Sequence, residues 1–229
     1  MTWRIAAVIA SLLVGACVVS PTPVPPGVID PERVTTVPNA ICEHGPCPPV
    51  IHLVGQAGAV SPGGALLWIA SLDDDSAPFT AIVREDGSFS ARVSGQGSDV
   101  LRLHAVVQDT WNEPTDIEAS TARPVALPCV AAVPGRVLDL GPADETLVRR
   151  VELRNDCGVD VALGPPRLRV GGTVFAPTEA PMALLPAETA PVAVERAAAA
   201  GENVDVLLID ITSPEPDRLA ITLVSRAPP

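Results

Sequence analysis

Lysine and tyrosine are missing from this sequence of 229 residues, and aromatic residues make up only 3% of it. All fifteen basic residues are therefore arginine, and the 27 acidic residues bring the formal net charge to −12. A face that binds nucleic acid needs clustered positive charge, and no such cluster occurs along the chain. Binding of sugars usually needs several aromatic side chains. The composition therefore argues against a nucleic-acid partner and disfavours a carbohydrate-binding surface.

Sequence motifs of catalysis and nucleotide binding are missing as well. The chain has only three histidines, His44, His52 and His104, and none lies in a metalloprotease or hydrolase motif. No P-loop, dinucleotide fingerprint or nucleophile elbow occurs. Glu113 and Asp116 could be imagined as the carboxylate pair of a glycosidase, but acids of this kind are routine in surface loops. We expect no enzymatic activity, no cofactor and no small-molecule substrate.

No hydrophobic run is long enough to cross a bilayer comfortably. Apolar or small residues occupy positions 5–16, which is shorter than the ~20 residues of a membrane-spanning helix. Arg4 and the α-amino group precede this run, and small residues end it. A positive start, an apolar core and small residues before a cleavage point are typical of a secretory signal peptide. We therefore expect residues 1–16 to be removed.

The end of the signal peptide carries a more specific pattern. Val14-Gly15-Ala16-Cys17 resembles the lipobox of bacterial lipoproteins, which implies that Cys17 becomes the N-terminal residue and carries acyl chains such as palmitate. Several acyl chains anchor a protein to the membrane effectively permanently. Val18 stands where lipoproteins kept in the inner membrane often have Asp, which favours the outer membrane. The alternative is ordinary cleavage near Ala16, leaving a free thiol.

The number of cysteines supports the lipobox interpretation. The chain contains five cysteines, and an oxidising compartment outside the cytoplasm favours their pairing. If Cys17 is spent on lipid, the remaining four can form two disulfides.

Residues 17–47 are expected to form a lipidated, proline-rich tether. Nine prolines lie between residues 18 and 49, and such segments favour extended polyproline II structure at ~3.1 Å per residue. The alternative is that residues 33–37 pack as an edge strand, because valine and threonine favour strands. Cys42 and Cys47 are expected to close a small disulfide loop. Zinc ligation by these cysteines and His44 lacks a fourth ligand nearby.

Residues 48–123 are expected to form a first β-sandwich. Short runs typical of antiparallel strands occupy residues 50–55, 65–70, 79–84, 88–93, 100–108 and 116–121. Asp86-Gly87 lies between two of these runs and predicts a hairpin. The alternation within residues 100–108 places His104 on the side opposite to the apolar residues, so we expect it at the surface. The stretch VGQAGAVSPGGALLWIA and the Asp86-Gly87-Ser88-Phe89 turn resemble bacterial immunoglobulin-like modules of surface proteins, which implies a fold and no particular function.

The densest group of charges in this unit is Asp73, Asp74 and Asp75. Together with nearby acids they could supply oxygen ligands to Ca²⁺, which takes six to eight. The ligand spacing of a calcium-binding loop is missing, and aspartate is common in solvated turns. We keep the three residues as weak calcium candidates and expect no metal site.

Residues 124–229 are expected to form a second β-sandwich. Strand-like runs occupy residues 137–140, 147–154, 159–163, 168–170, 173–175, 182–185, 192–195, 204–212 and 219–225. The apolar run at 204–212 fits a central strand. The segments GRVLDLG, RRVELRN and LLPAETAPVAV resemble the ASPM/Hydin-type immunoglobulin-like domain, which is related to major sperm protein.

One departure from that family is the cysteine in DCGVDV. Within the resemblance, Cys157 is expected to pair with Cys129, which precedes the first strand, and closing a loop of ~29 residues would stabilise the fold by roughly 3.5 kcal/mol. Cross-pairing with Cys42 or Cys47 is the alternative.

The fold class predicted from the sequence is all-β, with two tandem immunoglobulin-like β-sandwiches after a cleaved signal helix and a proline-rich tether. The predicted function is that of a cell-envelope lipoprotein of the outer membrane, which presents its modules for protein–protein interaction or scaffolding. Its expected partners are the membrane, through the acyl chains, and an envelope protein. The alternative function is a lipoprotein that binds carbohydrate or peptidoglycan.

Overall fold

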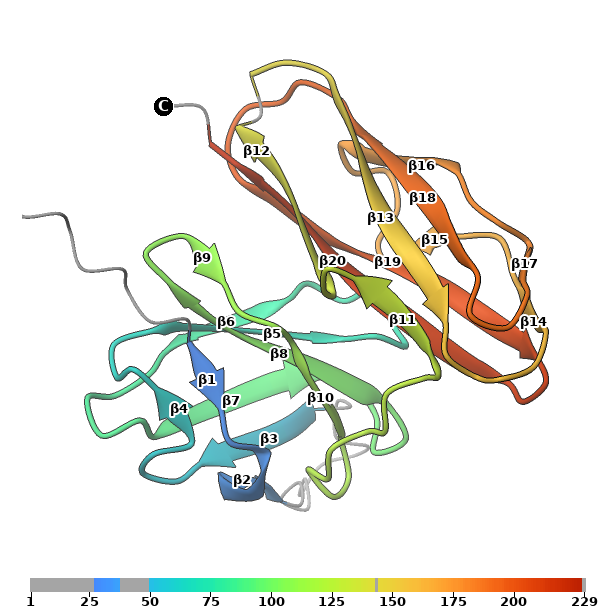
Figure 1. Cartoon of the computed structure of the whole chain (residues 1–229). Coiled ribbons are helices and arrows are strands. Elements are labelled where there is room, and N and C mark those ends of the chain that lie inside the picture. The colour runs from blue at the N-terminus through green and yellow to red at the C-terminus, as the bar shows by residue number, and fades with distance from the viewer. Residues whose placement is uncertain (1–26, 38–49, 143, 228–229) are drawn as a thin grey trace, which may run out of the picture.

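The computed structural model describes residues 27–37, 50–142 and 144–227 (Figure 1). Cys17, Cys42, His44 and Cys47 lie outside these ranges, and so do the predicted signal peptide and most of the tether. Within these ranges the chain is almost entirely β-structure, with one short 3₁₀ helix, η1 (Pro31–Arg33), and no α-helix. The predicted all-β fold is confirmed. Among the described residues, no helix is long and apolar enough to cross a membrane.

The first sandwich packs two sheets around one apolar core. One sheet has the order β2 (Val34–Val37), β3 (Val50–Gly55), β7 (Phe89–Ser94). The other has the order β10 (Thr115–Glu118), β8 (Val100–Val107), β5 (Leu66–Ser71), β6 (Phe79–Ile82), with β9 (Thr110–Trp111) also paired to β8. Two short strands, β1 (Val28–Ile29) and β4 (Val60–Ser61), pair with each other. Alternate residues of β7 are buried and exposed, as a sheet with one solvated face requires.

The N-terminal part of this sandwich corrects the tether prediction. Residues 28–37 are part of the folded unit, because β1 pairs with β4 and β2 pairs with β3 as an edge strand. Ile29 and Val34 are buried in the core. Pro31 opens the 3₁₀ helix, where a missing N–H removes no hydrogen bond. Apolar burial and strand pairing therefore determine the structure of this segment despite its prolines.

The predicted hairpin at Asp86-Gly87 is correct as a turn and wrong as a strand pair. The turn closes through hydrogen bonds from the Gly87 N–H to the Arg84 carbonyl and from the Arg84 N–H to the Ser88 carbonyl. The flanking strands then separate, because β6 pairs with β5 while β7 pairs with β3 in the opposite sheet. Gly87 has φ +82° and lies so close to the Val60 carbonyl that a Cβ would clash with it. The turn sequence determines where the chain reverses, but core packing determines which sheet each strand joins.

The second sandwich is also built from two sheets. One has the order β11 (Val130–Val133), β13 (Leu147–Asn155), β18 (Thr189–Arg196), β16 (Phe175–Glu179). The other has the order β12 (Val137–Pro142), β20 (Asp217–Arg226), β19 (Asn203–Ser213), β14 (Val161–Leu163), β17 (Ala183–Leu184), with β15 (Arg167–Leu168) also paired to β19. The apolar run predicted as a central strand is β19, at the middle of its sheet. β11 was missed, because a short alanine-rich segment between prolines carries a weak strand signal.

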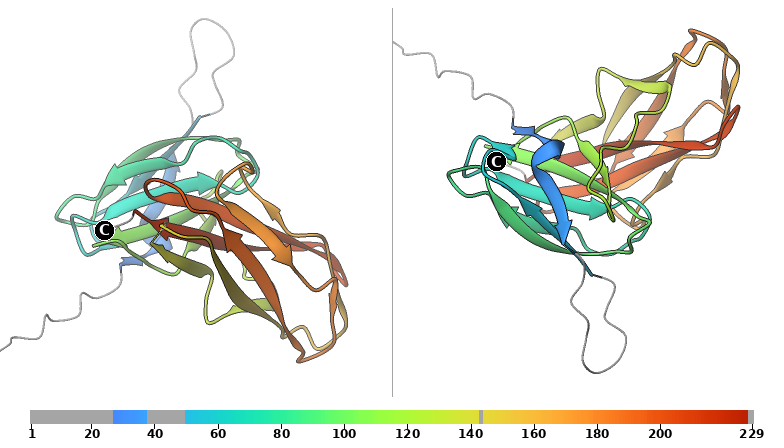
Figure 2. Two further views of the ribbon diagram at one scale, coloured as in Figure 1. Left: turned by 90° about the horizontal axis from the view of Figure 1, so that it is seen from above. Right: turned by 90° about the horizontal axis from the view of Figure 1, so that it is seen from below.

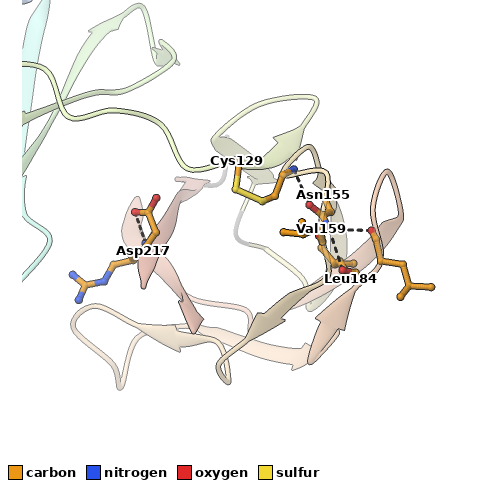
Figure 3. The surroundings of a disulfide bond; sticks show 8 residues. Cys129, Asn155, Val159, Leu184 and Asp217 are labelled. Carbon is orange, nitrogen blue, oxygen red and sulfur yellow. Dashed lines mark hydrogen bonds between the residues drawn. A yellow bond between two sulfur atoms is a disulfide. The ribbon is translucent and has the colours of Figure 1, made fainter. Parts of the chain in front are cut away.

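A disulfide joins Cys129, directly before β11, to Cys157 in the turn after β13 (Figure 3). Beside it, the Asn155 side chain donates to the carbonyls of Val159 and Leu184 at 2.8 and 3.0 Å, and its oxygen accepts from the Cys157 N–H at 2.9 Å. The pairing implied by the family resemblance is confirmed. The disulfide and the amide together hold the start of β11 and the turn at one end of the sandwich.

The two sandwiches contact each other through the faces of their sheets. The ribbons of β5 and β8 of the first face those of β19 and β20 of the second (Figures 1 and 2). In β5 and β8, alternate side chains belong to the sandwich core, and apolar side chains between them belong to a cluster shared with β19 and β20. The same alternation holds in β19 and β20. These four strands are therefore buried on both faces, which explains why their sequences are nearly continuous apolar runs.

Candidate functional site

Buried polar and apolar residues outside the two cores gather at this contact, which we call the seam. Its apolar part is a cluster of buried residues from both sandwiches: Trp68, Ala70, Leu72, Val206, Leu208 and Ala220. All but Leu72, which directly follows β5, lie on the outward face of a central strand, one residue away from side chains that fill a sandwich core. The seam is therefore a third apolar core, and burying it stabilises one relative position of the two sandwiches.

Three aromatic rings extend this core at one side. Trp68, His104 and Trp111 contact one another edge to face, with ring centroids 5.6, 5.6 and 5.1 Å apart. Trp68 is 5% exposed and His104 is fully buried. Such pairs contribute about 0.5–1.5 kcal/mol beyond their buried area. Two of the few aromatic side chains in this protein are therefore used to join the modules.

His104 is the largest disagreement with the sequence-based prediction, which placed it at the surface. Its Nδ1 lies 2.9 Å from the Asn112 carbonyl and its Nε2 lies 2.8 Å from the Thr222 hydroxyl of the second sandwich. A carbonyl only accepts, so Nδ1 carries the proton and Nε2 accepts from Thr222. Burial, with a smaller contribution from the charge of nearby Arg102 and against the hydrogen bond to the Asn112 carbonyl, lowers the pKa of His104 to about 3. The imidazole is therefore neutral and bridges the two sandwiches.

A second buried cation lies beside it. Arg102 is fully buried and donates from Nε and Nη2 to the two oxygens of Asp116, both at 2.8 Å. Its Nη1 donates to the Thr222 hydroxyl at 3.2 Å. That hydroxyl thus accepts from Arg102 and donates to His104. One threonine of the second sandwich satisfies two buried polar groups of the first.

The network continues into the segment that connects the sandwiches. Arg136 donates from Nη1 to Asp116 at 2.7 Å and from Nε to Glu113 at 2.8 Å. Burial raises the pKa of Asp116, but the two guanidinium groups outweigh it and hold the pKa below its usual value. Two arginines and two acids therefore form a charge-balanced network. We call the hydrogen-bonded set of Arg102, His104, Glu113, Asp116, Arg136 and Thr222 the seam network.

The aspartate loop proposed as a weak calcium candidate also contacts the second sandwich. Arg169 of the second sandwich inserts Nη1 among the carbonyls of this loop, 2.9 Å from those of Asp74 and Ser76. Arg218 donates to the Asp73 side chain at 2.8 Å. Two of the protein's own cations thus use oxygens that calcium would need.

The described part of the chain contains no group of three or more His, Cys, Asp or Glu side chains placed to hold a metal ion. Through Arg169 and Arg218, the loop that contains Asp73, Asp74 and Asp75 forms a contact between the two sandwiches.

One histidine outside the seam has a hydroxyl partner. His52 Nε2 lies 2.9 Å from the Ser90 hydroxyl, and both side chains are on the exposed face of β3 and β7. A nucleophile and base of this kind need a third group that orients the base. Among the residues described here, no carboxylate is hydrogen-bonded to the other ring nitrogen of His52. Glu113 and Asp116, the pair considered as glycosidase carboxylates, both bind Arg136.

Two adjacent hollows lie along the connecting segment at the edge of the seam. The larger is a groove of about 320 Å³ lined mainly by small and apolar residues: Glu113, Leu127, Pro128, Val130, Ala131, Ala132, Pro134, Gly135, Arg136 and Leu219. A smaller hollow of about 80 Å³ shares Leu127, Pro128, Arg136 and Leu219 with it. The groove reaches the seam network through Glu113 and Arg136.

The fold and the seam together define a pair of β-sandwiches joined face to face. No protein-family model matches the chain, and no curated protein matches it. Among solved structures, it is similar to the VesB protease of Vibrio cholerae, with 8% identity over 72% of this chain and 62% of that chain and a TM-score of 0.39. The chain thus spans less than two thirds of that protease.

A protein of unknown function from Porphyromonas gingivalis W83 is 14% identical, over 88% of this chain and 100% of that chain, with a TM-score of 0.37. Escherichia coli alpha-2-macroglobulin activated by porcine elastase is 12% identical, over 79% of this chain and 21% of that chain, with a TM-score of 0.31. Scores of this size are too low to assign a fold or a function.

Proposed function

We propose that the protein is a lipid-anchored component of the bacterial cell envelope that holds two β-sandwiches as one rigid body for contact with another envelope protein. The observation that carries this proposal is the seam. An apolar cluster and a charge-balanced network stabilise one relative position of the sandwiches, so their remaining edges keep a constant geometry. A scaffold that binds a partner across two modules requires such a constant geometry.

The proposed anchor determines how close to the membrane this body is held. Gly27 lies ten positions after Cys17, and a chain of that length spans at most about 35 Å. At Gly27 the chain is already against the sandwich, since a Cβ there would lie 2.7 Å from the Ala105 side chain. The tether is therefore much shorter than the predicted 17–47. An outer-membrane lipoprotein built this way keeps its first module near the bilayer.

The resemblance to immunoglobulin-like modules supports the same proposal. Both units are β-sandwiches of short strands, as that resemblance implies, and modules of this kind serve commonly in contacts between proteins. The net charge of −12 favours a partner with a basic face.

The alternative function, binding of carbohydrate or peptidoglycan, is less well supported by the positions of the aromatic residues. Trp68 is buried in the seam and Trp111 packs against it. Phe89 and Phe175 are buried in the two cores, and Phe79 packs against the first. A sugar-binding platform needs exposed rings, and the described residues provide no tryptophan or phenylalanine that is fully exposed. We propose a non-enzymatic role on similar grounds, since no carboxylate in the described ranges orients His52 beside Ser90.

Metabolic labelling with a radioactive fatty acid tests the anchor. We expect wild-type protein to be labelled and to fractionate with the outer membrane, and Cys17→Ser to be unlabelled and soluble. The structure describes Cys129 and Cys157 as a disulfide, so Cys129→Ser serves as the control and keeps its label. Unlabelled wild type in the soluble fraction would refute the anchor and the proposed localisation.

Crosslinking in intact cells, followed by purification of the lipoprotein, tests the interaction role. We expect a defined envelope protein in constant proportion. Recovery of glycan strands without a protein partner would instead favour the carbohydrate-binding alternative.

A further inference from the structure

The groove beside the seam runs along a strand that is paired on one side only. β11 is the terminal strand of its sheet and pairs with β13 through residues 130–133. The groove is lined by Val130, Ala131 and Ala132, but by no residue of β13. It therefore lies along the unpaired edge of β11, between this strand and Leu219 of the opposite sheet.

An unpaired strand edge can accept a further strand. In an antiparallel pair, the N–H and C=O groups of every second residue point away from the partner, toward the open side. Peptides bind such edges by strand addition, in which main-chain hydrogen bonds supply affinity and pockets for alternate side chains supply specificity. Short side chains in β11 leave room for a neighbouring backbone. The free edge and the groove are separate observations, and both favour an extended peptide.

The lining of the groove indicates which side chains it accepts. Leu127 is 64% exposed and forms part of the wall with Pro128. The volume of about 320 Å³ lies at the lower end of the usual range for binding pockets, about 300–1,000 Å³. Apolar side chains of a bound strand would cover Leu127, which otherwise exposes apolar surface to water.

The two charged residues of the groove, Arg136 and Glu113, differ in the hydrogen-bonding capacity that they have left for a ligand. Arg136 already donates from Nε, Nη1 and Nη2 to Glu113, Asp116 and the Pro114 carbonyl. The Glu113 side chain is 55% exposed, and a carboxylate can accept about four hydrogen bonds. Glu113 accepts from the backbone N–H and Nε of Arg136, and its exposed carboxylate has acceptor capacity left for a further donor; the net charge of the chain is negative as well. A cationic side chain fits this end of the groove better than an acidic one.

We propose that the free edge of β11 and its groove bind an extended segment of a partner protein, which adds as a strand to β11, places an apolar side chain against Leu127 and presents a lysine or arginine to Glu113. This proposal deepens the proposed function, because it names the surface by which the paired modules would hold their envelope partner. It does not depend on the lipid anchor.

Binding of three synthetic peptides to the purified full-length mature protein tests this inference. The first is a fluorescent nine-residue peptide of alternating valine and threonine with lysine at both ends. The second has glutamate in place of lysine, and the third has N-methyl groups on alternate amides. We expect saturable fluorescence anisotropy for the lysine peptide, weaker binding for the glutamate peptide and none for the N-methylated one, since it cannot complete the strand.

Leu127→Ser and Leu185→Ser are the matched variants. Both leucines are at least 60% exposed, so neither substitution is expected to unfold the protein, but Leu185 does not line the groove. Losing the contact of one leucine side chain should weaken binding of the lysine peptide about tenfold in Leu127→Ser. The affinity in Leu185→Ser should stay within about twofold of wild type.

Three results would overturn the inference: no saturable binding of the lysine peptide, equal affinity in wild type and Leu127→Ser, or undiminished binding of the N-methylated peptide. Sedimentation of the protein without peptide tests whether a second copy of the chain occupies the groove. A dimer that Leu127→Ser converts to monomer would assign the groove to a second copy of the chain. Fatty-acid labelling of Cys17 is unaffected by any of these outcomes, so failure of the strand-addition proposal and failure of the anchor are distinguishable.

Discussion

The buried neutral histidine of the seam makes the stability of this protein dependent on pH. The pKa of His104 is about 3 in the folded chain, chiefly because of burial, and about 6.5 in an unfolded chain. As the pH falls below 6.5, the unfolded state binds a proton that the folded state does not bind. Stability contributed by neutral His104 is therefore complete above pH 6.5 and is lost progressively down to about pH 3.

The size of this loss of stability follows from the difference between the folded and unfolded pKa values of His104. Each pH unit in that window removes about 1.4 kcal/mol, so lowering the pH from 6.5 to 4.5 removes roughly 2.7 kcal/mol from the free energy of unfolding. The groups that face His104 are Arg102, Asp116 and Arg136. The pKa of Asp116 is below its usual 3.8, so its own contribution is lost only below about pH 3.8, outside the interval from pH 6.5 to 4.5.

Urea unfolding of wild type and His104→Gln at pH 7.0 and 4.5 measures this effect. Glutamine does not titrate, and it keeps one donor and one acceptor for Asn112 and Thr222. We expect wild type to lose about 2–3 kcal/mol more than the variant between the two pH values. Equal losses in the two proteins would refute the reasoning, and so would an NMR titration that places the pKa of His104 near 6.5.

Three further predictions concern the contacts between and within the modules. Thr222→Val removes the hydroxyl partner of the Arg102 Nη1 and of the His104 Nε2, and should lower the free energy of unfolding in urea by about 1–3 kcal/mol. The control Thr212→Val, at an exposed position, should lower it by less than about 0.5 kcal/mol. Similar losses in the two variants would contradict the role of the network. Arg169→Met should speed hydrogen exchange in the loop at residues 71–76, which loses its guanidinium donor, and unchanged protection there would contradict that role. Reducing the Cys129–Cys157 disulfide should lower stability by roughly 3.5 kcal/mol on the chain-entropy model, and an unchanged urea midpoint would argue against its stabilising the second sandwich.

Much of the strand pattern could be predicted from the sequence because it depends on local alternation. The run at residues 50–55 is β3 with the same bounds, and the apolar run at 204–212 is the central strand β19. The disulfide partner of Cys157 was available only through the resemblance to a domain family. Which sheet each strand joins was not predicted, and the strands beside Gly87 show why. A turn signal describes four residues, while sheet membership depends on the whole core.

The contact between the sandwiches also shows that local sequence patterns do not predict which surfaces pack together. Arg102 and His104 alternate with leucines, and in one isolated sandwich that pattern indicates a solvated face. Only the second sandwich covers that face, and a partner distant in sequence leaves no local pattern. A signal was present in hindsight: Trp68 and Ala70 on the outward face of β5 are apolar, which a solvated face would not favour.

By itself, the sequence determined that this protein is all-β, where most of its longer strands lie, and which N-terminal cysteine resembles a lipidation site. Those features depend on residue spacing and local chemistry, which short stretches of chain contain in full. The tertiary structure alone decided that residues 28–37 belong to the first sandwich, that His104 is buried and neutral, and that the edge of β11 borders a groove. Each of these depends on which surfaces exclude water from one another, and that is a property of segments brought together from distant parts of the chain.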